Sequence, residues 1–195
     1  MRQATLERKT AETCISLSLC LEGGAVDVQT GCGFFDHMLT LLARHAGFGL
    51  TLACRGDLQV DAHHTVEDCG IALGRALKRC LGDCRGIARY GSFLLPMDEA
   101  LVLVALDISG RCHLACDLPL PAPRVGDFDT ELGREFFLAL CREAALTLHI
   151  RELAGENTHH ILEAAFKGVG RALAQAVAPD VRRPDDIPST KGVIG

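Results

Sequence analysis

The sequence repeats itself at an offset of 96 residues, and this repeat constrains the fold more than any other feature. The segment LTLACR at 50–55 is matched by LTLHIR at 146–151, and HHTVEDCGIALGRAL at 63–77 is matched by HHILEAAFKGVGRAL at 159–173. In the longer pair, 7 of the 15 positions are identical. Because one series of elements occurs twice, we expect two similar halves related by pseudo-twofold symmetry.

Hydrophobic spacing predicts the elements of each half. Apolar residues recur every three or four positions in FFDHMLTLLARHA and TELGREFFLALCREAA, which predicts one helix per half. A short LTL strand follows each, and each H-H-x-x-E segment begins a second helix, the first of which ends near Gly82. The order strand, helix, strand, helix is completed by strands at 101–108 and 112–118 between the halves.

The predicted fold class is therefore α+β, with a small mixed sheet and two helices in each half. We place the first half at 1–90, the second at 91–180 and a C-terminal substrate-binding arm at 181–195. Prolines at 179, 184 and 188 exclude a helix or a central strand from the end of the chain.

Composition excludes several classes of protein. With 48% hydrophobic and 23% charged residues among 195, the chain is neither disordered nor fibrous. A net charge of −5 argues against a general nucleic-acid binder. The N-terminal MRQATLERKTAE is no secretory signal, and the longest apolar run, ALVLVAL, falls short of the roughly 20 residues of a membrane span. We expect a cytoplasmic protein whose ten cysteines, without a C-x-x-C pair, are reduced thiols.

The doubled H-H-x-x-E motif predicts a metal centre. Within a helix, the histidines and the glutamate at i, i+3 and i+4 can converge on one face, whereas adjacent histidines point about 100° apart. Each pair of histidines therefore suits two different ions, and ligands from nitrogen and oxygen favour manganese, iron or another transition metal. We expect the shells to be completed by the other half or another subunit. The candidate ligands are His37, His63, His64, Glu67, Glu135, His159, His160 and Glu163.

Basic and hydroxyl residues form a second group that suits a phosphate. We expect them in or near loops or helix ends: Arg89, Arg111, Lys167, Ser189, Thr190 and Lys191. Neither GCGFF nor GVGRAL fits a nucleotide-binding glycine pattern, which argues against a nucleotide substrate. Glu12, Glu67 and the pair Asp98 and Glu99 are further carboxylates available for acid or base chemistry.

These motifs resemble the imidazoleglycerol-phosphate dehydratases of histidine biosynthesis. The segments that carry the resemblance occur in the family's order: KTAET, GFFDHML, DAHHTVED, RYG, PMDEAL, DISGR, EFF, GENTHHILEAAFK and PSTKG. The resemblance implies a duplicated α+β fold and two Mn(II) ions per active site, held by the paired motifs. It also implies trimers that assemble into a 24-subunit shell with active sites between subunits.

The resemblance also implies residue roles. All eight candidate ligands match metal ligands, although many members have His where this chain has Glu135. The six phosphate candidates match substrate ligands, together with Glu12, His37 and His45, and the catalytic set is Glu12, His45, Glu67 and Glu163. The implied reaction converts D-erythro-imidazole glycerol phosphate to imidazole acetol phosphate and water. Metal-bound substrate imidazolate would be the electron sink, with a diazafulvene-like intermediate.

Two other functions remain open from the residues alone. A metal-assembled cage or storage protein would use the duplicated sites structurally, but it would leave the basic loops without a purpose. A di-metal phosphohydrolase would use the same metals and phosphate ligands, and free phosphate release would identify it.

Overall fold

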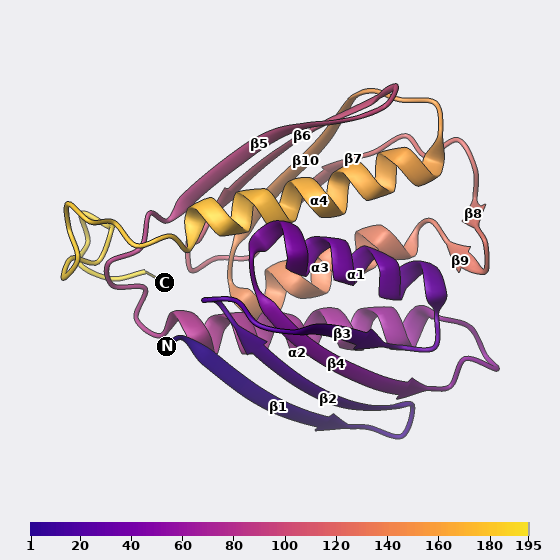
Figure 1. Ribbon diagram of the computed structural model, residues 1–195, viewed down its shortest axis with the longest axis horizontal. Coiled ribbons are helices and arrows are strands. Elements are labelled where there is room, and N and C mark those ends of the chain that lie inside the picture. Colours follow the sequence, from indigo (N-terminus) through magenta and orange to yellow (C-terminus); the bar gives the residue numbers. More distant parts are fainter. Residues whose placement is uncertain (195) are drawn as a thin grey trace.

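Four helices lie between two β-sheets in the computed structural model, which describes residues 1–194 (Figure 1). The first half of the chain forms one sheet and the second half forms the other. None of the described helices is long and apolar enough to cross a membrane. The helices are α1 (Gly33–Ala46), α2 (His63–Leu81), α3 (Leu132–Ala144) and α4 (Thr158–Ala176).

The two sheets have the same topology. The first has the order β1-β2-β4-β3 and the second β5-β6-β10-β7. In both, the first three strands in this order are antiparallel and the last pair is parallel. The predicted duplicated α+β fold is thereby confirmed. The strands are β1 (Gln3–Lys9), β2 (Thr13–Cys20), β3 (Val26–Gln29), β4 (Gly49–Gly56), β5 (Tyr90–Met97), β6 (Ala100–Asp107), β7 (His113–Asp117) and β10 (Thr147–Ala154).

The predicted order of strand, helix, strand, helix was incomplete. Each half has three strands before its first helix, and a small hairpin of β8 (Arg124–Val125) and β9 (Phe128–Asp129) lies in the proline-rich connection to α3. The strands β1 and β2 alternate buried and exposed residues, because one face of their sheet packs on α2 and the other faces outward. This alternation with a period of two is a strand signal, whereas the expected order of elements rested on helical spacing.

The repeated glycines explain how the halves join. Helix α2 packs against α3 and α4 against α1, so each pair takes one helix from each half. A Cβ on Gly74 would lie 2.8 Å from the carbonyl oxygen of Leu140, and one on Gly170 would lie 2.5 Å from that of Leu42. Both glycines belong to the repeated GRAL segment, so a close helix crossing accounts for their identity. The two halves consequently share one core.

The chain after α4 forms no helix or named strand as far as residue 194. It is tied to the body by the bridge between Ile87 and Pro179 and by a hydrogen bond from Gly86 N to the carbonyl oxygen of Asp186. The expected arm at 181–195 ends with Gly195, which lies outside the described residues. The proposed boundaries at 90 and 180 stay predictions.

Candidate active site

All four helices begin at the same end of the molecule (Figure 1). Helices α1, α2 and α4 each follow a strand that runs toward that end, and α2 and α4 carry their paired histidines in the first turn. Asp61 accepts a hydrogen bond from the backbone N–H of His63, and Asn157 caps α4 by accepting from the N–H groups of His159 and His160. The helix geometry therefore gathers the histidines of both motifs at one end.

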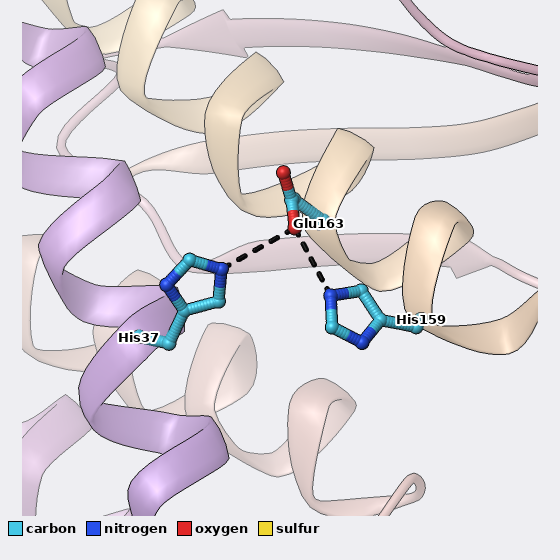
Figure 2. A group of neighbouring side chains, drawn as sticks. All are labelled: His37, His159 and Glu163. Carbon is cyan, nitrogen blue, oxygen red and sulfur yellow. Dashed lines mark hydrogen bonds and ion pairs between the residues drawn. The ribbon is translucent and has the colours of Figure 1, made fainter.

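Three of the eight predicted ligands form a compact cluster. Glu163 Oε2 lies 3.1 Å from His159 Nε2 on the same helix and 3.4 Å from His37 Nε2 on α1. Figure 2 shows the carboxylate between the two imidazoles, and the three ligand atoms lie within 4.8 Å of one another. Among residues 1–194 this is the one group with the spacing of a metal site.

Lys167 contacts the other oxygen of Glu163, Oε1, and helps to keep this carboxylate charged. Burial alone would raise the pKa of Glu163, whose side chain is 9% exposed. The hydrogen bond and positive charge of Lys167 oppose that effect, as do hydrogen bonds from His159 and His37, and the net result is a lowered pKa. The cluster thus presents an ionised carboxylate and two imidazoles, a ligand set that suits a transition metal.

The second histidine of each motif points to a different carboxylate. His64 Nδ1 lies 3.0 Å from Asp57, and His160 Nδ1 lies 2.8 Å from Glu99. Because an ionised carboxylate only accepts hydrogen bonds, Nδ1 carries the proton in both cases and Nε2 is left available. These hydrogen bonds raise the pKa of His64 and of His160. This pattern is the usual support for a metal-binding histidine.

The remaining predicted ligands do not join the His37 cluster. His63 Nε2 is 3.9 Å from Glu67 Oε2, and the other oxygen of Glu67 accepts a hydrogen bond from Arg142 at 3.2 Å. Glu135 lies in the first turn of α3, where its nearest charged partner is Arg134 at 3.4 Å. One chain therefore presents the predicted ligands in separate groups.

Two hairpin turns reach the two motifs. Glu12, between β1 and β2, places Oε1 3.6 Å from His64 Nε2, and Glu99, between β5 and β6, binds His160. The two glutamates differ in charge environment. Glu99 also accepts from the N–H of Asn157, and its hydrogen bonds, first that of His160, lower its pKa to about 2. Glu99 is therefore fixed as an acceptor, whereas the side chain of Glu12 is half exposed.

The phosphate candidates lie mainly at the opposite end of the helices. The backbone N–H of Arg89 donates to the carbonyl oxygen of Ala176, the last residue of α4. Its guanidinium donates to Asp107 at 2.7 Å and to the carbonyl oxygen of Pro188 at 2.8 Å. With Ser189 and Thr190 it lines a hollow of about 770 Å³. Lys191 lies in the same segment.

Other members of this group are placed differently. Arg111 follows β6 at the Arg89 end and donates to the carbonyl oxygen of Ser109. Lys167 was expected near a helix end, and this was wrong: it lies in the middle of α4, where it reaches Glu163. His45 lies two turns beyond His37 on α1. Burial and the charge of Arg171 lower its pKa, and its Nδ1 is buried without a hydrogen-bond partner.

Arg89 and the His37 cluster are too far apart to meet within one chain. From His159 to Ala176, α4 rises 1.5 Å per residue, which separates the metal cluster from Arg89 by about 26 Å. A phosphate ester of an imidazolyl three-carbon chain is roughly 10 Å long by standard bond lengths. One small ligand cannot touch both groups of the same copy.

Sequence reasoning missed two supporting carboxylates. Asp57 holds His64, and Asp107 holds Arg89 with both carboxylate oxygens. Glu99 was expected only as a spare acid or base, but it holds His160. The available signal was chemical: each candidate imidazole or guanidinium has a second N–H that needs an acceptor.

Comparison with known proteins decides the family. A family model described as imidazoleglycerol-phosphate dehydratase matches residues 30–173. The chain belongs to the imidazoleglycerol-phosphate dehydratase family. The resemblance inferred from the motifs is confirmed. The chain is accordingly an enzyme, a dehydratase of histidine biosynthesis that acts on a small phosphate substrate.

The similarity covers the chain from end to end. Imidazoleglycerol-phosphate dehydratase of Cereibacter sphaeroides (strain KD131 / KCTC 12085) is 60% identical over 195 residues, which are 100% of both chains. The crystal structure of the dehydratase from Staphylococcus aureus subsp. aureus N315 is 40% identical, covers 91% of this chain and 99% of its own, and has a TM-score of 0.84. That from Pyrococcus furiosus, in complex with (S)-C348, is 38% identical over 96% of this chain and 99% of its own, also with a TM-score of 0.84. The family is metal-dependent, which fits the His37 cluster.

Proposed function

We propose that this enzyme converts D-erythro-imidazole glycerol phosphate to imidazole acetol phosphate and water. The observation that carries the proposal is the convergence of His37, His159 and Glu163 in a dehydratase of this family. A cage or storage protein would have no use for the arm and for the Arg89 hollow. A phosphohydrolase would share both groups of residues, but the relatives of this chain are named as dehydratases.

The metal proposed is manganese, with two Mn(II) ions per active site. The donor set of imidazoles and carboxylates without thiolate fits this ion. Its proposed ligands are the eight residues predicted from the sequence, namely His37, His63, His64, Glu67, Glu135, His159, His160 and Glu163. When bound, two such ions would supply positive charge that stabilises the imidazolate form of the substrate ring.

The chain's own residues would perform the rest of the reaction. Glu12 is the proposed base that takes the carbon-bound proton, since its carboxylate is half exposed and is not held as an acceptor in the way that Glu99 is. A histidine of the paired motifs is proposed to assist the departing hydroxyl, which must gain a proton to leave as water. His45 is proposed to contact the substrate. These steps remove one proton and one hydroxyl and so balance as a dehydration.

The proposed phosphate ligands are Arg89, Arg111, Lys167, Ser189, Thr190 and Lys191. Because a substrate of roughly 10 Å cannot span the separation of about 26 Å between Arg89 and the His37 cluster, a complete site needs residues from more than one copy. This separation supports the proposal of trimers assembled into a 24-subunit shell with active sites between subunits. We also propose a cytoplasmic location, in keeping with a biosynthetic role.

The test is turnover of imidazole glycerol phosphate by the purified enzyme, with the product carbonyl and free phosphate followed separately. We expect carbonyl product that disappears after chelation and returns on addition of Mn(II). Phosphate release without carbonyl product would identify a phosphohydrolase. No turnover by enzyme with tightly bound metal would favour a structural metal site.

A further inference from the structure

We propose that Asp68 is a positioning residue that holds the β1–β2 turn against α2 and so sets the reach of Glu12 toward His64. The inference rests on the proposed role of Glu12 as the base. Asp68 is a buried carboxylate, 7% exposed, next to the motif residue Glu67 but not among the predicted ligands. A buried carboxylate is costly unless it is paired, so its partners show what it is for.

Both oxygens of Asp68 bind the β1–β2 hairpin. Oδ2 accepts a hydrogen bond from the hydroxyl of Thr13 at 2.5 Å, and Oδ1 lies 2.7 Å from the guanidinium Nη2 of Arg8. Arg8 lies near the end of β1, and Thr13 is the first residue of β2. The carboxylate therefore ties both strands to α2 next to the turn that joins them. Charge-assisted hydrogen bonds of this kind are shorter and stronger than neutral ones.

The turn between these strands is ordered by Thr10. Its N–H donates to the carbonyl oxygen of Thr13 at 2.9 Å, and its Oγ1 accepts from the N–H of Thr13 at 2.9 Å and from that of Glu12 at 3.2 Å. The backbone of Glu12 is consequently fixed between Thr10 and the Thr13 that Asp68 binds.

The geometry of α2 completes the link. Residues four apart lie on one face of a helix, so Asp68 and His64 face the same way. The hairpin is bound at Asp68 and extends along this face until Glu12 Oε1 lies 3.6 Å from His64 Nε2. The side chain of Glu12 is 51% exposed and has no hydrogen-bond partner of its own among residues 1–194, so its position depends on the turn.

The second half of the chain has no counterpart of Asp68, and its hairpin is held in a different way. Ala164 occupies the place that corresponds to Asp68 at the repeat offset of 96 residues. There the hairpin is held by Glu99 itself, which binds the N–H of Asn157 and the imidazole of His160. In the first half, Asp68 and Thr13 hold the hairpin instead, and the carboxylate of Glu12 stays free for chemistry.

The test is a double-mutant cycle between Asp68→Asn and Glu12→Gln, measured as kcat and KM for dehydration on the Mn(II)-loaded enzyme. Residues that act through one another are non-additive in such cycles. We expect Asp68→Asn alone to lower kcat by about 10-fold or more, because misplacing a reacting group by about 1 Å can cost of the order of 100-fold. KM and manganese content should change less than about 2-fold. In the Glu12→Gln background, Asp68→Asn should lower kcat by less than about 2-fold.

A second pair of variants covers the case in which Asp68→Asn fails to fold. Thr13→Val removes the donor hydroxyl and should lower kcat, whereas Thr13→Ser keeps the hydroxyl and should have a kcat close to that of the wild type. Thr51→Val, on the exposed face of β4, is the matched control and should leave kcat unchanged. A purely structural role would lower the melting temperature but not kcat measured well below it.

The outcomes separate this inference from the proposed function. An unchanged kcat in Asp68→Asn and in Thr13→Val would overturn the inference while Glu12 remains the base. An equal loss in the wild-type and Glu12→Gln backgrounds would also overturn it. If Glu12→Gln itself leaves kcat unchanged, the proposed base is wrong and the positioning role falls with it.

Discussion

The close crossing of α1 and α4 at Gly170 makes a quantitative prediction. In Gly170→Ala the new Cβ would lie 2.5 Å from the carbonyl oxygen of Leu42 and 3.1 Å from the backbone nitrogen of Ala46, whereas ordinary contacts begin at 3.4 Å. Neither neighbour is a flexible side chain, so the helices must move apart by nearly an ångström. Overpacking of this kind costs about 1–3 kcal/mol, and Ala returns up to about 1 kcal/mol through its higher helix propensity.

We therefore expect Gly170→Ala to lower the free energy of unfolding by about 1–2 kcal/mol. For a chain of this length, each 1 kcal/mol corresponds to roughly 2–4 °C in melting temperature, so the midpoint should fall by about 2–8 °C. The crossing also sets the distance from His37 on α1 to His159 and Glu163 on α4. Manganese affinity should consequently fall in the same variant.

Gly33→Ala is the matched control, because Gly33 lies in α1, the helix that Gly170 approaches, but a Cβ there would meet nothing within 4 Å. Its melting temperature should stay the same or rise. Thermal unfolding followed by circular dichroism at one protein and metal concentration checks both variants. If Gly170→Ala were as stable as Gly33→Ala, the close crossing would not be the reason for the repeated glycine.

Three further predictions concern charge and thiol chemistry. The hydrogen bond from Arg75 lowers the pKa of Glu143 despite partial burial. The pair therefore stabilises the packing of α2 against α3 fully above about pH 4.3, the pKa of an unfolded Glu. This stabilisation disappears as the pH falls through the lowered pKa. Glu143→Gln should cost up to about 1 kcal/mol at pH 7 and nothing near pH 2 in urea unfolding. Arg89→Ala should raise KM by about 10-fold or more and speed tryptic cleavage of the arm, since Arg89 holds Pro188; an intact arm with unchanged KM would contradict this. A thiol reagent should modify the exposed Cys112 first in the native enzyme, because burial raises the pKa of Cys80 and of Cys116 to about 11, and Cys112→Ser should remove the fast phase.

The repeat predicted most of the fold because helix periodicity and strand alternation are local properties. Helices α1 to α4 and strands β4, β6, β7 and β10 lie where the spacing of apolar residues placed them. The pairing of α1 with α4 and of α2 with α3 could not be predicted in this way. It depends on close contact at Gly74 and Gly170, and the sequence shows only that these glycines are repeated.

The site was predictable as residue types and less so as geometry. Neighbouring residues on one helix, such as His159 and Glu163, are brought together by the helix period alone. The approach of His37 from α1 and the support of His64 by Asp57 depend on packing between elements distant in the sequence. The position of Arg89 at the far end of α4 from the metal cluster could not be predicted either. It depends on the hydrogen bond between Arg89 and Ala176, two residues that are distant in the sequence.

If His37, His159 and Glu163 hold a catalytic metal, then manganese content and dehydratase turnover should both depend on Glu163, and we propose to measure the two together. The wild-type enzyme is compared with Glu163→Gln and with the control His113→Gln, which alters an exposed histidine on β7. We predict two Mn(II) per active site and full turnover in the wild type and in the control. Glu163→Gln should lose about one ion and at least about 100-fold in kcat, the upper end of the loss seen when a residue that supports a metal is changed. Full manganese content and turnover in Glu163→Gln would show that Glu163 holds no catalytic metal.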